Sequence, residues 1–151
     1  MFLKVQGVTG EAIDADHKGE IDVVSWSWGM ESPREAMTGQ AKGRVVVSEL
    51  QIIKRVDQSS PTLMSYLRTN KVVTEAALTV RKAGEKPLEY FRIELQNAKV
   101  TSLRAESSGD ELVERLNLGF SKLKVIYTPQ GKTGASGGGK VEFETDAHAG
   151  A

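Results

Sequence analysis

The chain has few motifs that could carry chemistry, and the most suggestive is a nucleophile motif centred on Ser136. Residues 134–138 read Gly-Ala-Ser-Gly-Gly, which matches the G-x-S-x-G turn of hydrolases. That turn joins a strand to a helix, whereas this copy lies in a glycine run with no apolar strand directly before it and no helix after it. We therefore interpret residues 131–139 as a flexible linker. The nearby Gly131-Lys132-Thr133 resembles the end of a phosphate-binding loop, but that loop needs glycine where this chain has Ile126.

Cysteine and histidine add little to the chemical repertoire. The chain has no cysteine, which excludes disulfide bonds, thiol catalysis and thiolate metal sites. Its two histidines are His17 and His148, and neither is obviously oriented for a Ser-His-Asp triad. Asp14, Asp16 and His17 could in principle bind a metal. We favour a polar turn between two strands, because aspartate side chains bond to nearby backbone groups in turns. The sequence thus predicts no catalytic residue, no cofactor and no metal.

Trp26 and Trp28 are the only tryptophans and stand two residues apart. In an extended strand they project from the same side, and Val24 and Met30 share that side. We interpret the two indoles as a structural aromatic face, since aromatic residues on strands usually pack into cores. A ligand platform is the alternative. Base stacking is unsupported, because it needs basic residues beside the rings and the nearest are Lys18 and Arg34.

Composition narrows the function classes further. The formal net charge is zero, and no run of Lys or Arg predicts a nucleic-acid surface. No segment approaches the ~18 apolar residues of a membrane helix, so we expect no membrane insertion. The first residues, Met-Phe-Leu-Lys-Val-Gln-Gly, turn polar too soon for a cleaved signal peptide. We expect residues 1–151 to form one domain, made in a cytosol and exported, if at all, without a cleaved signal.

Alternating apolar and polar residues predict mostly β-strands. Half-buried antiparallel strands are expected over 44–56, 75–81, 91–96 and 112–128, with the carboxylates on their wet faces. In the last of these, Leu116 and Leu118 have one parity, whereas Leu123 and Val125 have the other. A one-residue slip reverses the faces, so we expect a bulge near Ser121-Lys122, where the strand turns a barrel corner.

One short helix and three irregular segments complete the pattern. Ser60 and Pro61 suit the start of a helix whose inner side would carry Leu63, Met64 and Leu67, and Asn70 tolerates the left-handed stop. The segment 31–43 is long, polar and punctuated by glycine, as functional loops often are. After the 131–139 linker, residues 141–145 alternate again and form a candidate last strand, and the tail 147–151 is expected to be loose.

The order of the segments resembles the Hcp family, the haemolysin-coregulated proteins of type VI secretion systems. The resemblance runs from about Phe2 to Gln130, and its quoted segments each match weakly but together form a specific series. They are Asp14–Lys18, Ile21–Gly29, Gly43–Asp57, Ser59–Leu63, Glu75–Gly84, Leu88–Phe91 and Phe120–Gln130.

The resemblance implies a mainly β fold, in which two packed antiparallel sheets form a barrel-like domain with one short α-helix on the side. It implies a homo-hexameric ring that stacks into the inner tube of the secretion apparatus and carries or chaperones effectors in its pore. Such a protein would start in the bacterial cytoplasm and leave through the apparatus, with the tip spike, the contractile sheath and the effectors as partners. Within the loop 31–43, we predict that Arg34, Met37 and Thr38 contact the next ring. The alternative is a monomeric β-barrel that binds a small ligand inside.

Overall fold

A computed structural model describes residues 1–33, 38–39, 45–82, 88–130 and 139–147. The Arg34 and Met37 positions, Ser136 and His148 lie outside these residues. The elements are β1 (Phe2–Val5), β2 (Ile21–Ser27), β3 (Met30–Glu31), β4 (Val46–Val47), β5 (Leu50–Arg55), α1 (Ser59–Arg68), β6 (Val72–Arg81), β7 (Glu89–Ser108), β8 (Glu111–Gly119), β9 (Lys122–Tyr127) and β10 (Val141–Asp146).

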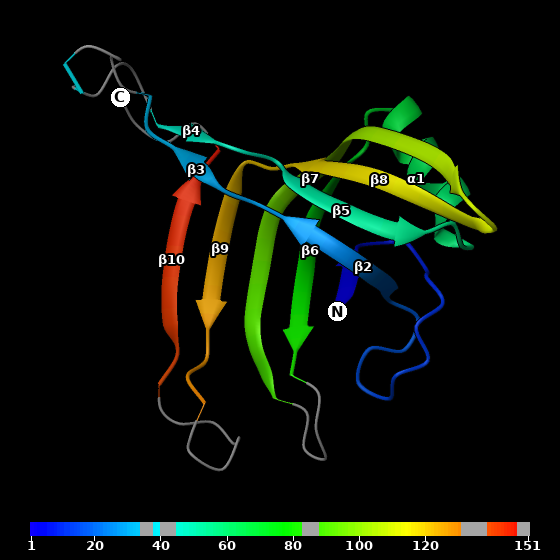
Figure 1. Ribbon diagram of the computed structural model, residues 1–151, viewed down its shortest axis with the longest axis horizontal. Helices are drawn as coiled ribbons and strands as arrows, with labels where there is room; N and C mark the ends of the chain where they lie inside the picture. The colour runs from blue at the N-terminus through cyan, green and yellow to red at the C-terminus, as the bar shows by residue number, and fades with distance from the viewer. Residues whose placement is uncertain (34–37, 40–44, 83–87, 131–138, 148–151) are drawn as a thin grey trace.

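Eight of the strands form one antiparallel sheet that closes on itself. The order is β10-β9-β7-β6-β1-β2-β5-β8, and β8 also pairs with β7. Strands β7, β6, β1, β2, β5 and β8 therefore make a closed barrel, and β9 and β10 continue the sheet beyond it (Figure 1). The mainly β, barrel-like domain with one helix is confirmed; its two packed layers are two parts of this single sheet.

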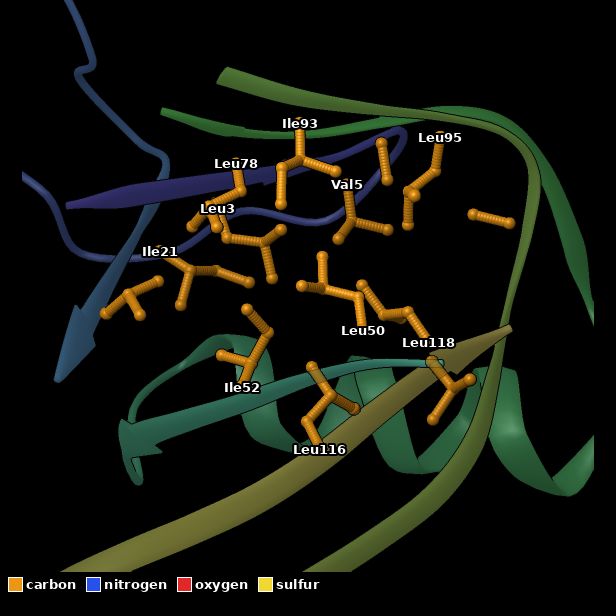
Figure 2. Close-up of a cluster of buried hydrophobic side chains, with 14 of the residues drawn as sticks. Leu3, Val5, Ile21, Leu50, Ile52, Leu78, Ile93, Leu95, Leu116 and Leu118 are labelled. Carbon is orange, nitrogen blue, oxygen red and sulfur yellow. The ribbon is translucent and has the colours of Figure 1, made fainter. Parts of the chain in front are cut away.

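The barrel interior is filled by aliphatic side chains from every barrel strand. Along β5 and β8 these residues alternate with less buried ones, as period-two patterning requires, whereas residues 76–80 of β6 are all buried, Thr79 included. Leu3, Leu50, Ile52, Leu78, Ile93, Leu95, Leu116 and Leu118 are almost entirely buried and point into a common core (Figure 2). Their packing leaves the centre occupied by the chain itself, so nothing in the described barrel favours an internal ligand.

Strand β7 spans 20 residues and bends between the two parts of the sheet. Asn97 has a positive φ of 51°, and the register with β8 shifts between Val100 and Ser102. The first half of β7 pairs with β6 and β9, and the second half pairs with β8. The phase change predicted a corner near Ser121-Lys122, on a neighbouring segment that contacts this bend through Asn97 Nδ2, which donates to Ser121 Oγ at 3.0 Å. The expected bulge is wrong, because the chain breaks instead into β8 and β9 around Phe120 and Ser121.

The predicted single strand over 44–56 is also two elements. Leu50 and Ile52 face the core in β5, whereas Val46 belongs to the separate ribbon of β3 and β4. The break follows from a change of partner: β5 pairs with β2 and β8, and β4 pairs with β3 alone among the described strands. At the break, the Ser48 N–H donates to Gly29 O at 2.9 Å, which links the segment between β4 and β5 to the segment between β2 and β3.

Helix α1 packs beside the barrel, mainly against β7. The predicted cap at Ser60 and first helical residue at Pro61 are each two residues late: the helix begins at Ser59, after Gln58, and Asp57 Oδ1 accepts the Ser59 N–H at 2.9 Å. Leu63 is buried, but Met64 is exposed and not on the inner side. Asn70 has a φ of 54° directly after the helix, which confirms the left-handed stop.

Candidate assembly surfaces

The sheet carries its apolar inner face beyond the barrel onto β9 and β10. Phe143 lies opposite Val125, which lies opposite Ile93 of the core. Residues that face each other across paired strands share one side of the sheet. Phe143 is nevertheless 44% exposed and Val141 is 61% exposed. We call the apolar side chains Val125, Tyr127, Val141 and Phe143 the β9–β10 face; it continues the core surface, and the rest of the described chain leaves it partly uncovered.

The opposite side of β9 and β10 is charged and self-compensated. Lys122 Nζ lies 3.3 Å from Glu144 Oε1, and Lys124 Nζ lies 3.2 Å from Glu142 Oε2. The hydrogen bond to Glu142 raises the pKa of Lys124 above its ordinary value, so this lysine stays cationic. Glu94 of β7 also lies opposite Lys124. This side suits water, whereas the other side needs an apolar cover.

Strand β10 also has an unpaired backbone edge within the described part of the chain, because β9 is its one neighbour there. An edge strand presents free N–H and C=O groups that can pair with another chain. The edge and the β9–β10 face lie on the same strand. Both features make this end of the sheet a candidate surface for contact with another protein chain.

A second projecting surface is the two-stranded arm formed by β3 and β4. Met30 pairs with Val47 and Glu31 pairs with Val46, and Met30, Val45 and Val46 are exposed. The arm continues the direction of β2 and β5 and leaves the barrel (Figure 1). It carries the loop predicted to contact the next ring. Of the three residues singled out there, Thr38 is described and exposed.

The two tryptophans lie where β2 leaves the barrel. Both are half-buried and pack against the core, and the Trp26 ring stacks on Phe91 with centroids 5.3 Å apart. Trp28 Nε1 is buried and has no hydrogen-bond partner in the described part of the chain. Val24 and Met30 do not join this side as expected, since both are exposed. A register shift between Val23 and Ser25 reverses the faces, so Val23 and Trp26 both point inward.

The acidic segment around His17 forms a clamped turn. Asp16 N–H donates to Asp14 Oδ1 at 3.0 Å, as in an aspartate turn. The Asp14 carboxylate accepts a hydrogen bond from each terminal nitrogen of Arg81, at 3.0 and 2.5 Å. His17 is buried, with its Nδ1 2.9 Å from Glu20 Oε2 and its Nε2 2.5 Å from Glu89 Oε1. These side chains therefore serve different partners, and the described residues include no group of three acidic, histidine or cysteine side chains arranged for a metal.

The neighbours of His17 also set its charge. Burial against Phe2, whose ring stacks at 4.5 Å, lowers the pKa of the imidazole. The hydrogen bonds to Glu89 and Glu20 outweigh burial and raise the pKa above the ordinary value of 6.5. The bidentate Arg81 bond lowers the pKa of Asp14 in the same turn. Charged hydrogen bonds thus fix this turn to the start of β7 and the end of β6.

A buried ionic network under α1 was not anticipated from the sequence. Lys54 is 0% exposed, and its Nζ lies 2.5 Å from Glu114 Oε1 and 3.1 Å from Ser60 Oγ. Asp57 Oδ1 is 3.2 Å from the same nitrogen. The signal was present, since Lys54 has the same parity as the core residues Leu50 and Ile52. The network ties the helix start to β5 and β8, and its Lys54 and Glu114 side chains are buried.

No described helix is long and apolar enough to cross a membrane.

Comparisons with known proteins give matches that cover most of the chain. Residues 2–127 match the family described as "Type VI secretion system effector, Hcp". The chain is 40% identical over 148 residues to Protein hcp1 of Pseudomonas aeruginosa, covering 95% of this chain and 91% of that protein.

Solved structures agree with the sequence comparisons. Hcp1 from Salmonella typhimurium is 31% identical with a TM-score of 0.77, over 97% of this chain and 92% of that one. A type VI secretion system effector from Yersinia pestis is 27% identical with a TM-score of 0.79, over 96% of this chain and 98% of that one. The family match spans most of the chain, and the TM-scores show that both solved structures share its fold. The chain therefore belongs to the Hcp family of type VI secretion proteins.

Proposed function

We propose that this chain is the structural subunit of a type VI secretion inner tube, in which six copies close into a ring and rings stack into a tube. The observation that carries the proposal is the β9–β10 face, an extension of the core surface that the described chain leaves partly uncovered. In a ring, every subunit has a neighbouring copy that can cover its β9–β10 face. The contact is heterologous, with two different surfaces meeting, and the rotation between copies closes the ring.

The two sides of β9 and β10 then have different roles. The apolar side packs against the next subunit in the ring. The side with paired Lys122, Lys124, Glu142 and Glu144 faces water, and in a ring the water-filled pore is a suitable place for it. Effectors would travel in this pore, and the tube would leave the bacterial cytoplasm with the spike protein at its tip as the sheath contracts. In this role the protein is a carrier and not an enzyme.

The loop 31–43 at the end of the arm is proposed to contact the next ring through Arg34, Met37 and Thr38. The arm, whose strands β3 and β4 flank this loop in the sequence, leaves the barrel, which suits a contact with a separate protein. Shortening the loop between Pro33 and Gly43 should leave single rings intact and weaken stacking and secretion. Tubes that form with normal efficiency would reduce the loop to a connector. Loss of the rings themselves would assign it to the contact within a ring.

The ring is tested by light scattering after size exclusion, with electron microscopy of the same fractions. The native protein should run at several times its monomer mass, and Phe143→Glu should shift it toward monomer by placing a charge in the contact. Leu112→Glu is the matched control, since Leu112 is 59% exposed on the hairpin between β7 and β8, away from the β9–β10 face. A native protein that stays monomeric over a wide concentration range would refute the proposal and favour the monomeric barrel.

A further inference from the structure

One end of the barrel presents a single isoleucine on a rigid loop. Ile13 is 95% exposed, although both sides of its loop are fixed by backbone hydrogen bonds. Gly10 N–H donates to Gly19 O at 2.7 Å, and Ala12 N–H donates to Glu20 O at 2.9 Å. A side chain at Gly10 would put its Cβ 2.4 Å from Glu20 O, so this close approach requires glycine. We call residues 10–20 the Ile13 loop.

Side chains on both sides of Ile13 anchor the loop to the barrel. Ala12 is buried, Asp14 bonds Arg81 at the end of β6, and His17 bonds Glu89 at the start of β7. The isoleucine is therefore held outward in a fixed position. An apolar anchor that is already ordered loses little conformational entropy on binding, which favours a docking role.

The opposite end of the same strands carries a hollow of about 530 Å³. Its wall includes the apolar groups of Val72, Phe120 and Ala147, and Lys99 and Asp146 also line it. Val72 begins β6 and Arg81 ends it, so the hollow and the Ile13 loop are separated by the ten residues of that strand. At 3.3 Å per residue this distance is roughly 30 Å.

We propose that Ile13 of one copy docks into this hollow on a copy in the next ring. The inference rests on the proposed tube function and names a contact between rings. A knob at one end and a hollow at the other are what an open, head-to-tail stack requires. Because Asp14 is already paired with Arg81, the charge that the loop offers to Lys99 of the hollow comes from the exposed Asp16, and Asp146 also lines that hollow. This contact acts together with the one proposed for the loop 31–43.

Cysteine pairing tests the contact directly, because the chain has no cysteine of its own. Rings of Ile13→Cys and rings of Val72→Cys are prepared separately, mixed and oxidised, so that a mixed disulfide reports contact between rings. A disulfide needs its two Cβ atoms about 3.8 Å apart. We expect several-fold more disulfide-linked dimer on a non-reducing gel than from the control pair Ile13→Cys with Leu112→Cys, whose leucine is equally accessible and lies outside the hollow.

A second variant measures the strength of the contact. Ile13→Asp should leave the ring mass unchanged and weaken stacking about tenfold or more, measured as the protein concentration needed for tubes to appear by electron microscopy. Equal yields from both cysteine pairs, or unchanged stacking in Ile13→Asp, would overturn the docking of Ile13 and leave the ring proposal standing. A native protein without rings would overturn both.

Discussion

Removing the Lys54 side-chain charge should destabilise the fold more than breaking any of the surface ion pairs. Lys54 is fully buried and Glu114 is 1% exposed, and they face each other across β5 and β8. Substitution Lys54→Met keeps most of the volume but leaves the Glu114 carboxylate with the Ser60 hydroxyl, 2.7 Å away, as its one remaining hydrogen-bond donor in the described chain. Glu114 Oε2 already has no partner there. The variant therefore buries an uncompensated charge.

The size of the effect follows from the chemistry of buried pairs. Breaking such a pair by removing one member typically costs about 3–5 kcal/mol of unfolding free energy. For a domain of this size each kcal/mol corresponds to about 2–4 °C in melting temperature, so Lys54→Met should lower it by roughly 6–20 °C. Replacing both members, as in Lys54→Met with Glu114→Leu, should cost clearly less than Lys54→Met alone, because neither charge is left buried.

Urea unfolding followed by tryptophan fluorescence measures these differences, with every variant at one protein concentration because assembly adds stability. Arg55→Met is the matched control: the neighbouring Arg55 pairs with Glu111 at 3.7 Å on the exposed surface. Its loss should change the free energy of unfolding by about 1 kcal/mol or less. The reasoning is refuted if Lys54→Met costs no more than Arg55→Met, or if the double variant is as unstable as the sum of its two single variants.

Three further predictions concern the turn around His17, the two tryptophans and the 131–139 linker. Because the folded-state pKa of His17 is raised, its stabilisation should be complete below pH 6.5 and disappear as the pH rises through that raised pKa; urea unfolding across this window should show a slope that His17→Gln removes. Trp26→Ala and Trp28→Ala should each lower stability, by up to about 3–5 kcal/mol because the rings are only half-buried, and unchanged melting in both would reopen a ligand role. The protein should lack hydrolytic activity of its own, and a robust activity abolished by Ser136→Ala would show otherwise.

Strands were predictable where side-chain alternation is local. In β7 the pattern fixes both the element and the inward face, because an inward residue meets an inward residue on its neighbour, as Ile93 meets Leu78 of β6. In β6 it gives the element, but residues 76–80 are buried on both faces. The ends of strands were less predictable. Glu49 and Gln51 alternate with Leu50 as a continuous strand would, yet Ser48 is where β4 and β5 part and take different partners. Alternation along one segment carries no information about that exchange.

Two further errors, on the side chains that accompany the tryptophans and on the bulge near Ser121, both concern whether inward residues have odd or even numbers. Ile21 and Val23 have odd numbers, whereas Trp26 and Trp28 have even ones, and both sets pack inward. Such a change of parity indicates a bulge, and the register shift lies between them, at Val23 and Ser25. The same reasoning was applied to Leu118 and Leu123, where a chain break rather than a bulge produced the change. Parity thus locates a corner without saying how the backbone makes it.

The ionic network needed information from both sides of the barrel. Lys54 interrupts the inward series of β5, and Glu114 interrupts the inward series that continues with Leu116 and Leu118. Each on its own resembles a tolerable exception near the end of a strand. Only the pairing of β5 with β8 places the two opposite each other. A buried lysine is best predicted by searching for an inward acidic residue on a candidate partner strand.

The β9–β10 face shows a limit that comes from assembly and not from folding. Residues 141–145 alternate as a half-buried strand should, and the strand is present as β10. Its apolar residues Val141 and Phe143 are nevertheless exposed in the single copy. An alternating apolar pattern reflects burial in the functional state of the protein, including burial against neighbouring chains. Where a regular apolar pattern stays exposed in a single copy, the mismatch itself indicates where another copy should be sought.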